Sequence, residues 1–429
     1  MKFDLLHPAD QLVMIMERIY LGGMTTTSGG NLSIMDENGN IWITPSGIDK
    51  GTLTRNDMCC IEPDGTINGP HKPSVELPFH AAVYKSRPDL RAMLHAHPPN
   101  LVAFSVTRKL PDINLIVNAR RTCEKLSMAK YAVPGSNELG DYIALEFEKG
   151  NNIVVMANHG VCIGADNLFN AFKMFETLEY CAAIEMNALQ LGKPNSLQES
   201  EINLTAKQNC LVLDEFVPNT HSSEERAARR DMVTLIRRSY RRNLFSSTQG
   251  TFSQRLSDGS FLITPYGVDR AYMDEGDLVL IKNGMREQGK VPSRSIMFHK
   301  LTYEKHKSIF SIIGAMPIHA MAFAMTDEPF DPRTIPESYI LLREIKKVPF
   351  ATIYTNPEEA VKLFSPRTHM LIWQNNQIIT TGNSLLLAFD RLEVAEAAAH
   401  SILLARSLGG LANISDSEIE VINQTFKLE

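Results

Sequence analysis

The sequence predicts an α/β protein built from two tandem copies of one domain, each a sheet covered by helices. Segments with helical spacing of apolar residues alternate with short apolar runs that end in glycine-rich turns. Motifs of the first half return in the second half at nearly constant spacing. With 429 residues, the chain is also too long for one ordinary core.

The first elements carry clear local signals. Residues 7–24 repeat apolar side chains at helical spacing and end at Gly22 and Gly23, which predicts a capped helix. Residues 25–35 predict a turn and a strand, and DENGN at 36–40 holds an Asn-Gly hairpin signal. The chain then returns as a strand into ITPSG, so a β-meander is expected.

The rest of the first half predicts helices on a sheet. Helices are expected at 76–86, at 100–109, after a cap at Ser136 or Asn137, and at 166–192, where the Phe and Met stripe is typical of core. Residues 113–120 (INLIVNAR) predict a strand. Residues 193–209 are polar and poor in aromatics, which favours a linker.

Two histidines stand one residue apart in RAMLHAHP, a run with the character of a short strand. His95 and His97 should therefore point to the same face. A third imidazole is available from His159, in the turn that follows another apolar strand. A single histidine is more often a core or surface residue, but three with an open fourth position indicate a catalytic zinc site. Glu76, at a predicted helix start, adds a carboxylate.

The second half repeats the first at an offset of 219 or 220 residues. Three pairs mark this spacing: Tyr20 and Tyr240, Gly47 and Gly267, and His80 and His299. In that register the second copy lacks the carboxylate and the three histidines. Ser295 stands in place of Glu76, Gly314 and Met316 in place of His95 and His97, and Asn376 in place of His159. None of these can hold zinc in the same way. We expect a catalytic domain at 1–200, a linker at 201–222 and a degenerate copy at 223–429.

Five motifs, in this order and spacing, carry a family resemblance: SGGNLS (28–33), ITPSG (43–47), KPSVE (72–76), HAH (95–97) and NHG (158–160). Together they resemble the class II aldolase/adducin head family over roughly the first 200 residues. The family includes L-fuculose-phosphate and L-rhamnulose-phosphate aldolases, a ribulose-phosphate 4-epimerase, a methylthioribulose-phosphate dehydratase and sugar-acid decarboxylases. The resemblance implies a three-layer α/β/α fold with a central, mainly antiparallel sheet.

The resemblance also implies roles for single residues. His95, His97 and His159 would bind Zn²⁺ or another divalent ion, and Glu76 would be the acid/base carboxylate. Glycine-rich turns alone are merely hairpin turns, but the family places phosphate at the positions that match Gly30, Asn31, Ser46, Gly47 and Ser74.

The implied activity is that of a zinc-dependent aldehyde-lyase, similar to L-fuculose-phosphate aldolase, acting on a small sugar phosphate through a zinc-stabilised enediolate. Epimerisation, dehydration and decarboxylation of a related sugar or sugar-acid phosphate use the same parts and stay open, as does a non-catalytic, adducin-like binding role.

Two departures from the family pattern bear on the choice among these activities. Val75 stands where the aldolases commonly have a second serine, and residues 113–121 lack the tyrosine that aldolases lend to a neighbouring subunit. Arg120 and Arg121, at the end of this segment, are either a solvated pair or a contact for an acidic substrate.

Composition and charge bound the partners. A net charge of -6 gives no reason to expect nucleic acid or membrane binding. No apolar run is long enough to span a bilayer, and the six cysteines lack disulfide-framework spacing, so a cytoplasmic location is expected. Family enzymes form rings of four domains, so a chain with two copies predicts a homodimer of about 96 kDa, twice 48.0 kDa, in a pseudo-fourfold ring, with larger assemblies open.

Overall fold

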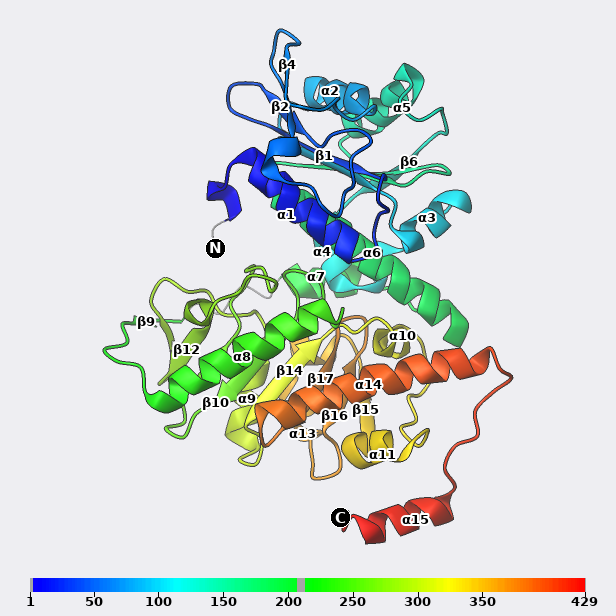
Figure 1. The fold of residues 1–429 in the computed structure, drawn as a ribbon. Coiled ribbons are helices and arrows are strands. Elements are labelled where there is room, and N and C mark those ends of the chain that lie inside the picture. The colour runs from blue at the N-terminus through cyan, green and yellow to red at the C-terminus, as the bar shows by residue number, and fades with distance from the viewer. Residues whose placement is uncertain (1–2, 207–212, 429) are drawn as a thin grey trace. The chain divides into compact units, whose positions relative to one another are not determined.

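The structure, a computed structural model, describes residues 3–206 and 213–428. The chain divides into two compact units, Met1–Ile113 with Asn118–Ala183, and Asn114–Val117 with Ile184–Glu429. Each unit is an α/β domain with its own sheet (Figure 1).

The described strands of the first unit form an eight-stranded sheet in the order β4-β3-β2-β1-β5-β8-β7-β6. β6 and β7 run parallel, and the other neighbours are antiparallel, so the expected mainly antiparallel sheet is confirmed. The strands are β1 (Asn31–Met35), β2 (Ile41–Ile43), β3 (Cys59–Ile61), β4 (Ile67–Asn68), β5 (Ala92–Ala96), β6 (Leu126–Ala129), β7 (Ile153–Met156) and β8 (Val161–Ala165).

Helices cover both faces of this sheet. One layer is α2 and α5, whose Phe79 and Phe147 pack with Met93 of β5 in a buried cluster. α1 buries Leu12 and lies on the other face, where its Arg18 guanidinium stands 4.4 Å above the ring of Phe172 in α6. The helices are α1 (Pro8–Leu21), α2 (Leu77–Ser86), α3 (Pro99–Val106), α4 (Val117–Cys123), α5 (Asn137–Glu148) and α6 (Leu168–Leu191), with 3-10 turns η1 (Phe3–Leu5), η2 (Arg55–Asp57) and η3 (Ile113–Leu115).

The strand predicted at 113–120 is wrong. This segment forms η3 and the start of α4 instead. Leu115 and Val117 belong to the second unit, and their backbone bonds a turn of that same unit rather than a sheet edge. The Asn375 side chain donates to Leu115 O at 2.9 Å, and Val117 N–H donates to Asn375 O at 3.3 Å. A short apolar run cannot by itself distinguish these outcomes, because it reports burial and not the hydrogen-bond partner.

In the second unit, the described strands form a nine-stranded sheet in the order β15-β16-β17-β14-β10-β11-β12-β13-β9. α8 and α14 lie along one face (Figure 1), and α9 and α13 pack with a buried cluster on the other. The strands are β9 (Glu215–Phe216), β10 (Thr251–Arg255), β11 (Phe261–Ile263), β12 (Val279–Lys282), β13 (Met285–Glu287), β14 (Ser311–Ala315), β15 (Ile345–Val348), β16 (Met370–Trp373) and β17 (Gln377–Gly382). The helices are α7 (Glu199–Ala206), α8 (Ser223–Arg241), α9 (Ile296–Lys305), α10 (Ala320–Met325), α11 (Pro336–Leu342), α12 (Thr352–Thr355), α13 (Pro357–Lys362), α14 (Leu385–Arg406) and α15 (Asp416–Thr425), with the 3-10 turn η4 (Glu275–Asp277).

The strand registers of the two units agree with the repeat. Asn31 of β1 pairs with His95, and Thr251 of β10 pairs with Gly314. The turns after β7 and β16 both contain an asparagine with positive φ, at Asn158 (55°) and at Asn375 (54°). Gly314 and Asn376 therefore occupy the places that His95 and His159 occupy in the first unit.

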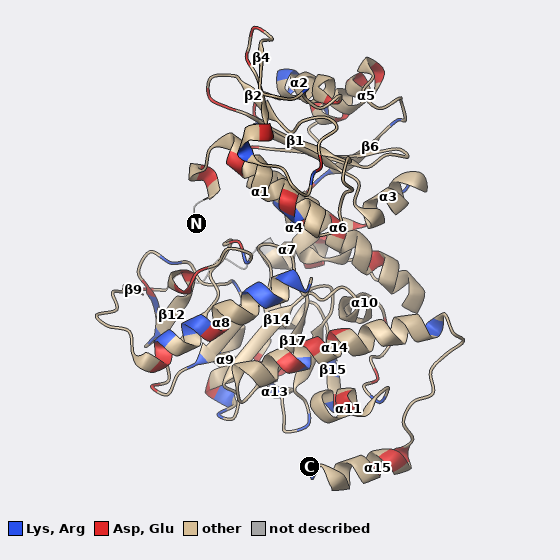
Figure 2. Cartoon of the chain, viewed as in Figure 1, with Lys and Arg blue, Asp and Glu red and all other residues tan. Residues whose placement is uncertain are grey.

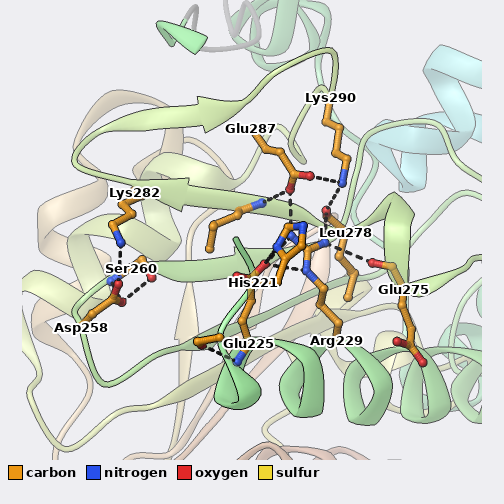
Figure 3. A network of polar contacts seen from close by, with 12 residues as sticks. His221, Glu225, Arg229, Asp258, Ser260, Glu275, Leu278, Lys282, Glu287 and Lys290 are labelled. Atoms are coloured by element: carbon orange, nitrogen blue, oxygen red, sulfur yellow. Dashed lines mark hydrogen bonds and ion pairs between the residues drawn. The ribbon is translucent and has the colours of Figure 1, made fainter. Parts of the chain in front are cut away.

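A buried ion network holds α8 to the second sheet. α8 carries many of the basic residues of this unit (Figure 2). Arg229 is buried, donates from Nε to Glu225 at 2.8 Å, and contacts Glu287 of β13 at 2.8 Å. It also donates to Leu278 O at 2.7 Å, while Lys290 lies 2.5 Å from Glu287 (Figure 3). Because each carboxylate is paired, this buried charge is compensated.

The segment expected to be a linker contains ordered elements. α7 covers its start, and β9 pairs in parallel with β13 at the edge of the second sheet. Residues 207–212, including Cys210, lie outside the described residues. The other five cysteines are free and buried. Within the described ranges, no helix has both the length and the apolar character needed to cross a membrane.

Candidate metal centre

Three imidazoles converge at one end of the first sheet. His95 lies one residue before the end of β5, and His97 follows two residues later on the same side. His159 stands in the tight turn between β7 and β8, where Asn158 adopts positive φ. The pairing of His95 with Cys162 brings this turn beside β5. One nitrogen of each of the three rings lies within 4.8 Å of the others, as the sequence predicts.

The backbone fixes which nitrogen of His95 is free. Its Nδ1–H donates to Val161 O at 3.0 Å, since a carbonyl oxygen can only accept. Nε2 therefore carries a lone pair, and it is buried without a hydrogen-bond partner, as is Nε2 of His97. A second hydrogen bond that fixes the tautomer in this way is typical of metal-binding histidines.

Glu76 faces the same point from the start of α2. It is the N-cap residue of that helix, and only 6% of it is exposed. Its Oε2 lies 3.3 Å from His95 Nε2, and its Oε1 lies 3.6 Å from His159 Nε2. Burial, then the neighbouring His159, lowers the pKa of His95 to about 3, and burial lowers that of His97 to about 4. These rings are therefore neutral near pH 7, and the 3.3 Å contact is not an ion pair.

Lone pairs of nitrogen and carboxylate oxygen thus face each other in a buried space. Such an arrangement is repulsive unless a cation or a proton lies between the atoms. Three neutral imidazoles and a carboxylate are a donor set that suits Zn²⁺ and related divalent ions. Among the residues described, this triad is the group of His, Cys, Asp or Glu whose ligand atoms come this close. The site therefore fits a divalent metal ion.

A chain of buried hydrogen bonds supports Glu76 from behind. Asn31 Nδ2 donates to Glu76 Oε2 at 2.6 Å, and His80 Nε2 donates to Asn31 Oδ1 at 2.5 Å. Burial lowers the pKa of His80 to about 3, so its Nδ1 is an acceptor, and Ser33 Oγ donates to it at 2.6 Å. Tyr84 OH lies 2.7 Å from the same Oγ. The direction of these bonds aims the Asn31 amide N–H at the carboxylate.

Sequence reasoning did not assign roles to Ser33, His80 and Tyr84. A signal for them existed, because the repeat pairs His80 with His299. In the second unit, Ser253 Oγ likewise contacts His299 Nδ1 and Tyr303 OH, both at 2.7 Å. The serine, histidine and tyrosine are thus kept in both copies, which indicates a structural role for that part of the chain.

The predicted phosphate-binding glycines occupy turns that require glycine. Gly30 has φ +71°, and a Cβ there would lie 2.7 Å from the carbonyl oxygen of His95. Gly47 has φ +70° and open space around its Cα. Both turns can therefore present backbone N–H groups to a ligand.

The remaining predicted residues lie in turns joined by backbone hydrogen bonds. Ser46 N–H donates to Lys72 O at 2.9 Å, and Ser74 N–H donates to Thr44 O at 3.3 Å. Ser74 Oγ accepts from Glu76 N–H at 3.3 Å. The anion-binding candidates and the carboxylate thus share one framework.

The sequence also singled out Val75, Arg120 and Arg121 as positions that bear on the substrate. The Val75 side chain is 67% exposed. Arg120, half-buried in α4, donates to the carbonyl oxygen of Glu124 at 3.2 Å, and Arg121 follows it on the same helix. The arginines therefore stand on a helix and not at the end of a strand.

Residues 10–186 and 230–403 each match the model described as Class II Aldolase and Adducin N-terminal domain. The chain belongs to this family. Two matched segments also confirm the tandem duplication that the repeat predicts.

Several aldolase-family proteins resemble one copy of the chain. It is 32% identical over 202 residues to the 5-deoxy-D-ribulose 1-phosphate aldolase of Bacillus thuringiensis serovar kurstaki, covering 46% of this chain and 93% of the relative. It is 29% identical over 195 residues to the L-fuculose phosphate aldolase of Escherichia coli strain K12, covering 45% and 86%. The 3-oxo-tetronate 4-phosphate decarboxylase of Haemophilus influenzae is also 29% identical over 195 residues, covering 44% and 92%. A solved structure described as L-fuculose 1-phosphate aldolase shares 32% identity with a TM-score of 0.42, covering 47% of this chain and 95% of that one.

Proposed function

We propose that the first copy is a zinc-dependent aldolase that cleaves a small ketose 1-phosphate. The observation that carries this proposal is the convergence of three neutral imidazoles and Glu76 on one buried point. The similarity to ketose 1-phosphate aldolases supports the substrate class. The second copy, at 223–429, would be non-catalytic because it lacks all four groups.

His95, His97 and His159 would hold the ion. When bound, a divalent ion polarises the substrate carbonyl and stabilises the negative charge that develops when the carbon–carbon bond breaks. Glu76 would take the proton from the hydroxyl on the carbon that becomes the aldehyde and return it to the carbon beside the carbonyl, so that the two fragments leave as an aldehyde and a neutral ketone. Asn31 holds Oε2 of Glu76 through its 2.6 Å hydrogen bond and so orients the carboxylate.

The substrate phosphate would bind at the linked turns. Gly30 and Gly47 would offer backbone N–H groups, and Ser46 and Ser74 would add hydroxyls. Asn31 differs from these candidates, because both ends of its side-chain amide already bond Glu76 and His80. Its contribution to an anion would therefore come from the backbone.

Decarboxylation of a 3-oxo sugar-acid phosphate is the second candidate. It is favoured by the 29% identity to the 3-oxo-tetronate 4-phosphate decarboxylase. The same site would serve, because loss of carbon dioxide leaves the same type of charge beside a carbonyl.

The test is a substrate screen on zinc-loaded, full-length protein. Ketose 1-phosphates are followed by release of dihydroxyacetone phosphate and aldehyde, and 3-oxo acid phosphates by release of carbon dioxide. Product from the first group supports the aldolase, and product only from the second supports the decarboxylase. Protein that carries no stoichiometric metal and turns over neither group would refute both, in favour of an adducin-like binding role.

A further inference from the structure

The second unit has a cavity of about 340 Å³ where β14 and β17 meet the start of α14. Gly382 lies in its wall and pairs with Ser311, the first residue of β14. The counterparts of the metal ligands lie at the other end of these strands, where Ala315 pairs with Ile378. The cavity is therefore distinct from the degenerate copy of the metal centre.

A buried arginine lines this cavity. Arg391 is only 8% exposed, and its Nε and Nη1 donate to the carbonyl oxygens of Leu341 and Thr381 at 3.1 and 2.6 Å. A guanidinium has five N–H groups, so three remain beyond these two bonds. Among the described residues, no carboxylate forms an ion pair with Arg391. Asp390, whose charge acts on it, is exposed.

A second arginine, Arg343, adds to the positive potential near Arg391. His369 also lines the cavity and is neutral near pH 7, because burial and then the charges of Arg391 and Arg343 lower its pKa to about 4. Asn383, which precedes the N-cap of α14, and Leu387 of its first turn also line the cavity, and the N-terminus of a 22-residue helix favours anions. A buried cation without a carboxylate partner is costly unless an anion completes it.

The first copy supplies an internal comparison, because the registers align the two regions. Arg87 is the C-cap of α2 in the first copy, and His306 is the C-cap of α9 in the second. The N-cap of the long helix also follows the paired strand residue by two positions in each copy, after Ala165 for α6 and after Gly382 for α14. Five replacements separate the copies: Arg87 to His306, Asp89 to Ser308, Asn152 to His369, Asp166 to Asn383 and Met174 to Arg391.

In the first copy, the charges at this place are compensated internally. Arg87 pairs with Asp89 at 2.7 Å and donates to Asn152 Oδ1 at 3.1 Å. The second copy has lost both carboxylates of this region and has gained a buried guanidinium in place of Met174. The change replaces a neutralised group of charges by a cavity that Arg391 lines without a carboxylate partner.

We propose that this cavity is a binding site for a small phosphate-bearing ligand, either free phosphate or a phosphate monoester. Arg391 would supply two parallel N–H donors, as guanidinium groups do for phosphate. Ser308 and Asn383 would add side-chain donors, and the start of α14 would complement the negative charge. The volume is enough for a small metabolite.

Equilibrium dialysis of the full-length protein against radiolabelled inorganic phosphate tests the site. Arg391→Met restores the residue of the first copy, and Arg230→Met, at an exposed position of α8, removes an equivalent charge as the control. The Arg391 variant should bind one phosphate fewer per chain, or bind it at least about tenfold more weakly, while the control matches the wild type. Competition by glycerol 3-phosphate distinguishes a monoester site from one for free phosphate.

A second variant keeps the test decisive if loss of the Arg391 hydrogen bonds prevents folding. The double variant Ser308→Asp/Asn383→Asp changes exposed positions only and restores both carboxylates of the first copy. This double variant should fold, and it should no longer bind the phosphate that the Arg391 variant fails to bind. Unchanged stoichiometry and affinity in this double variant, or no saturable phosphate binding attributable to the second unit in the wild type, would overturn the proposal.

Discussion

Replacing Glu76 by glutamine should separate proton transfer from metal binding. Glutamine keeps an oxygen that can accept the 2.6 Å hydrogen bond from Asn31, and it has nearly the same volume in a site that is 6% exposed. The three imidazoles are untouched. Fold and zinc occupancy should therefore persist, while the group that carries the proton is lost.

The expected loss in kcat is about 10²- to 10⁴-fold, the usual contribution of a general acid or base. This corresponds to about 2.7 to 5.5 kcal/mol in activation free energy. The assay measures kcat on the substrate found in the screen, beside zinc content by atomic emission. Ser295→Ala, at the equivalent N-cap of α9, is the matched control and should leave kcat unchanged. Near wild-type turnover by the zinc-loaded Glu76 variant would refute the assigned role.

Four further predictions follow from the same structure. His95→Ala and His159→Ala should each lose zinc during dialysis against buffer, because two nitrogen ligands rarely retain it; full occupancy in either variant would contradict the ligand assignment. Asn31→Thr, which introduces the residue of the second copy, should lower kcat by roughly tenfold with zinc retained, since a hydrogen bond to the carboxylate is lost; an effect on KM alone would instead indicate substrate binding. His80 and His299 have pKa values lowered to about 3 by burial, whereas an unfolded histidine titrates near 6.5. The unfolded state therefore binds more protons below pH 6.5, and the free energy of unfolding should fall by about 2 kcal/mol per histidine on going to pH 5; urea unfolding curves that coincide at pH 7.5 and pH 5 would contradict this. Light scattering should give a homodimer of about 96 kDa, twice 48.0 kDa, and an active monomer would exclude the proposed ring.

The meeting of the three histidines was predictable because its signals are local. His95 and His97 share a strand face by the two-residue period, and the turn at Asn158 and Gly160 marks where His159 leaves the sheet. The hairpin at DENGN and the helix cap at Ser136 also formed as predicted. Each of these features depends on residues within one or two turns of chain.

The features that escaped prediction depend on distant partners. INLIVNAR has an apolar pattern suited to a strand, but its backbone is satisfied by Asn375, far away in sequence. The side chain of Asn31 bonds Glu76 and His80, 45 and 49 residues away, and the sequence did not predict these contacts. A pattern of single residues carries no information on which partner a polar group will meet.

The two copies separate structural from chemical roles within one buried chain of hydrogen bonds. Serine, histidine and tyrosine persist in the second unit as Ser253, His299 and Tyr303, with the same contacts. Asn31 and Glu76 are replaced together, by Thr251 and Ser295. If Asn31 served only to fill the core, its replacement would not need to accompany loss of the carboxylate.

The second copy closes the gap left by these two replacements with hydroxyl groups. Thr251 Oγ1 lies 2.8 Å from Ser293 Oγ, which lies 3.1 Å from Ser295 Oγ. Neutral hydroxyls satisfy one another and need neither a cation nor an oriented amide donor. The first copy retains the costlier arrangement of a buried carboxylate aimed at three unprotonated imidazoles, and the proposed metal ion would give that arrangement its physical reason.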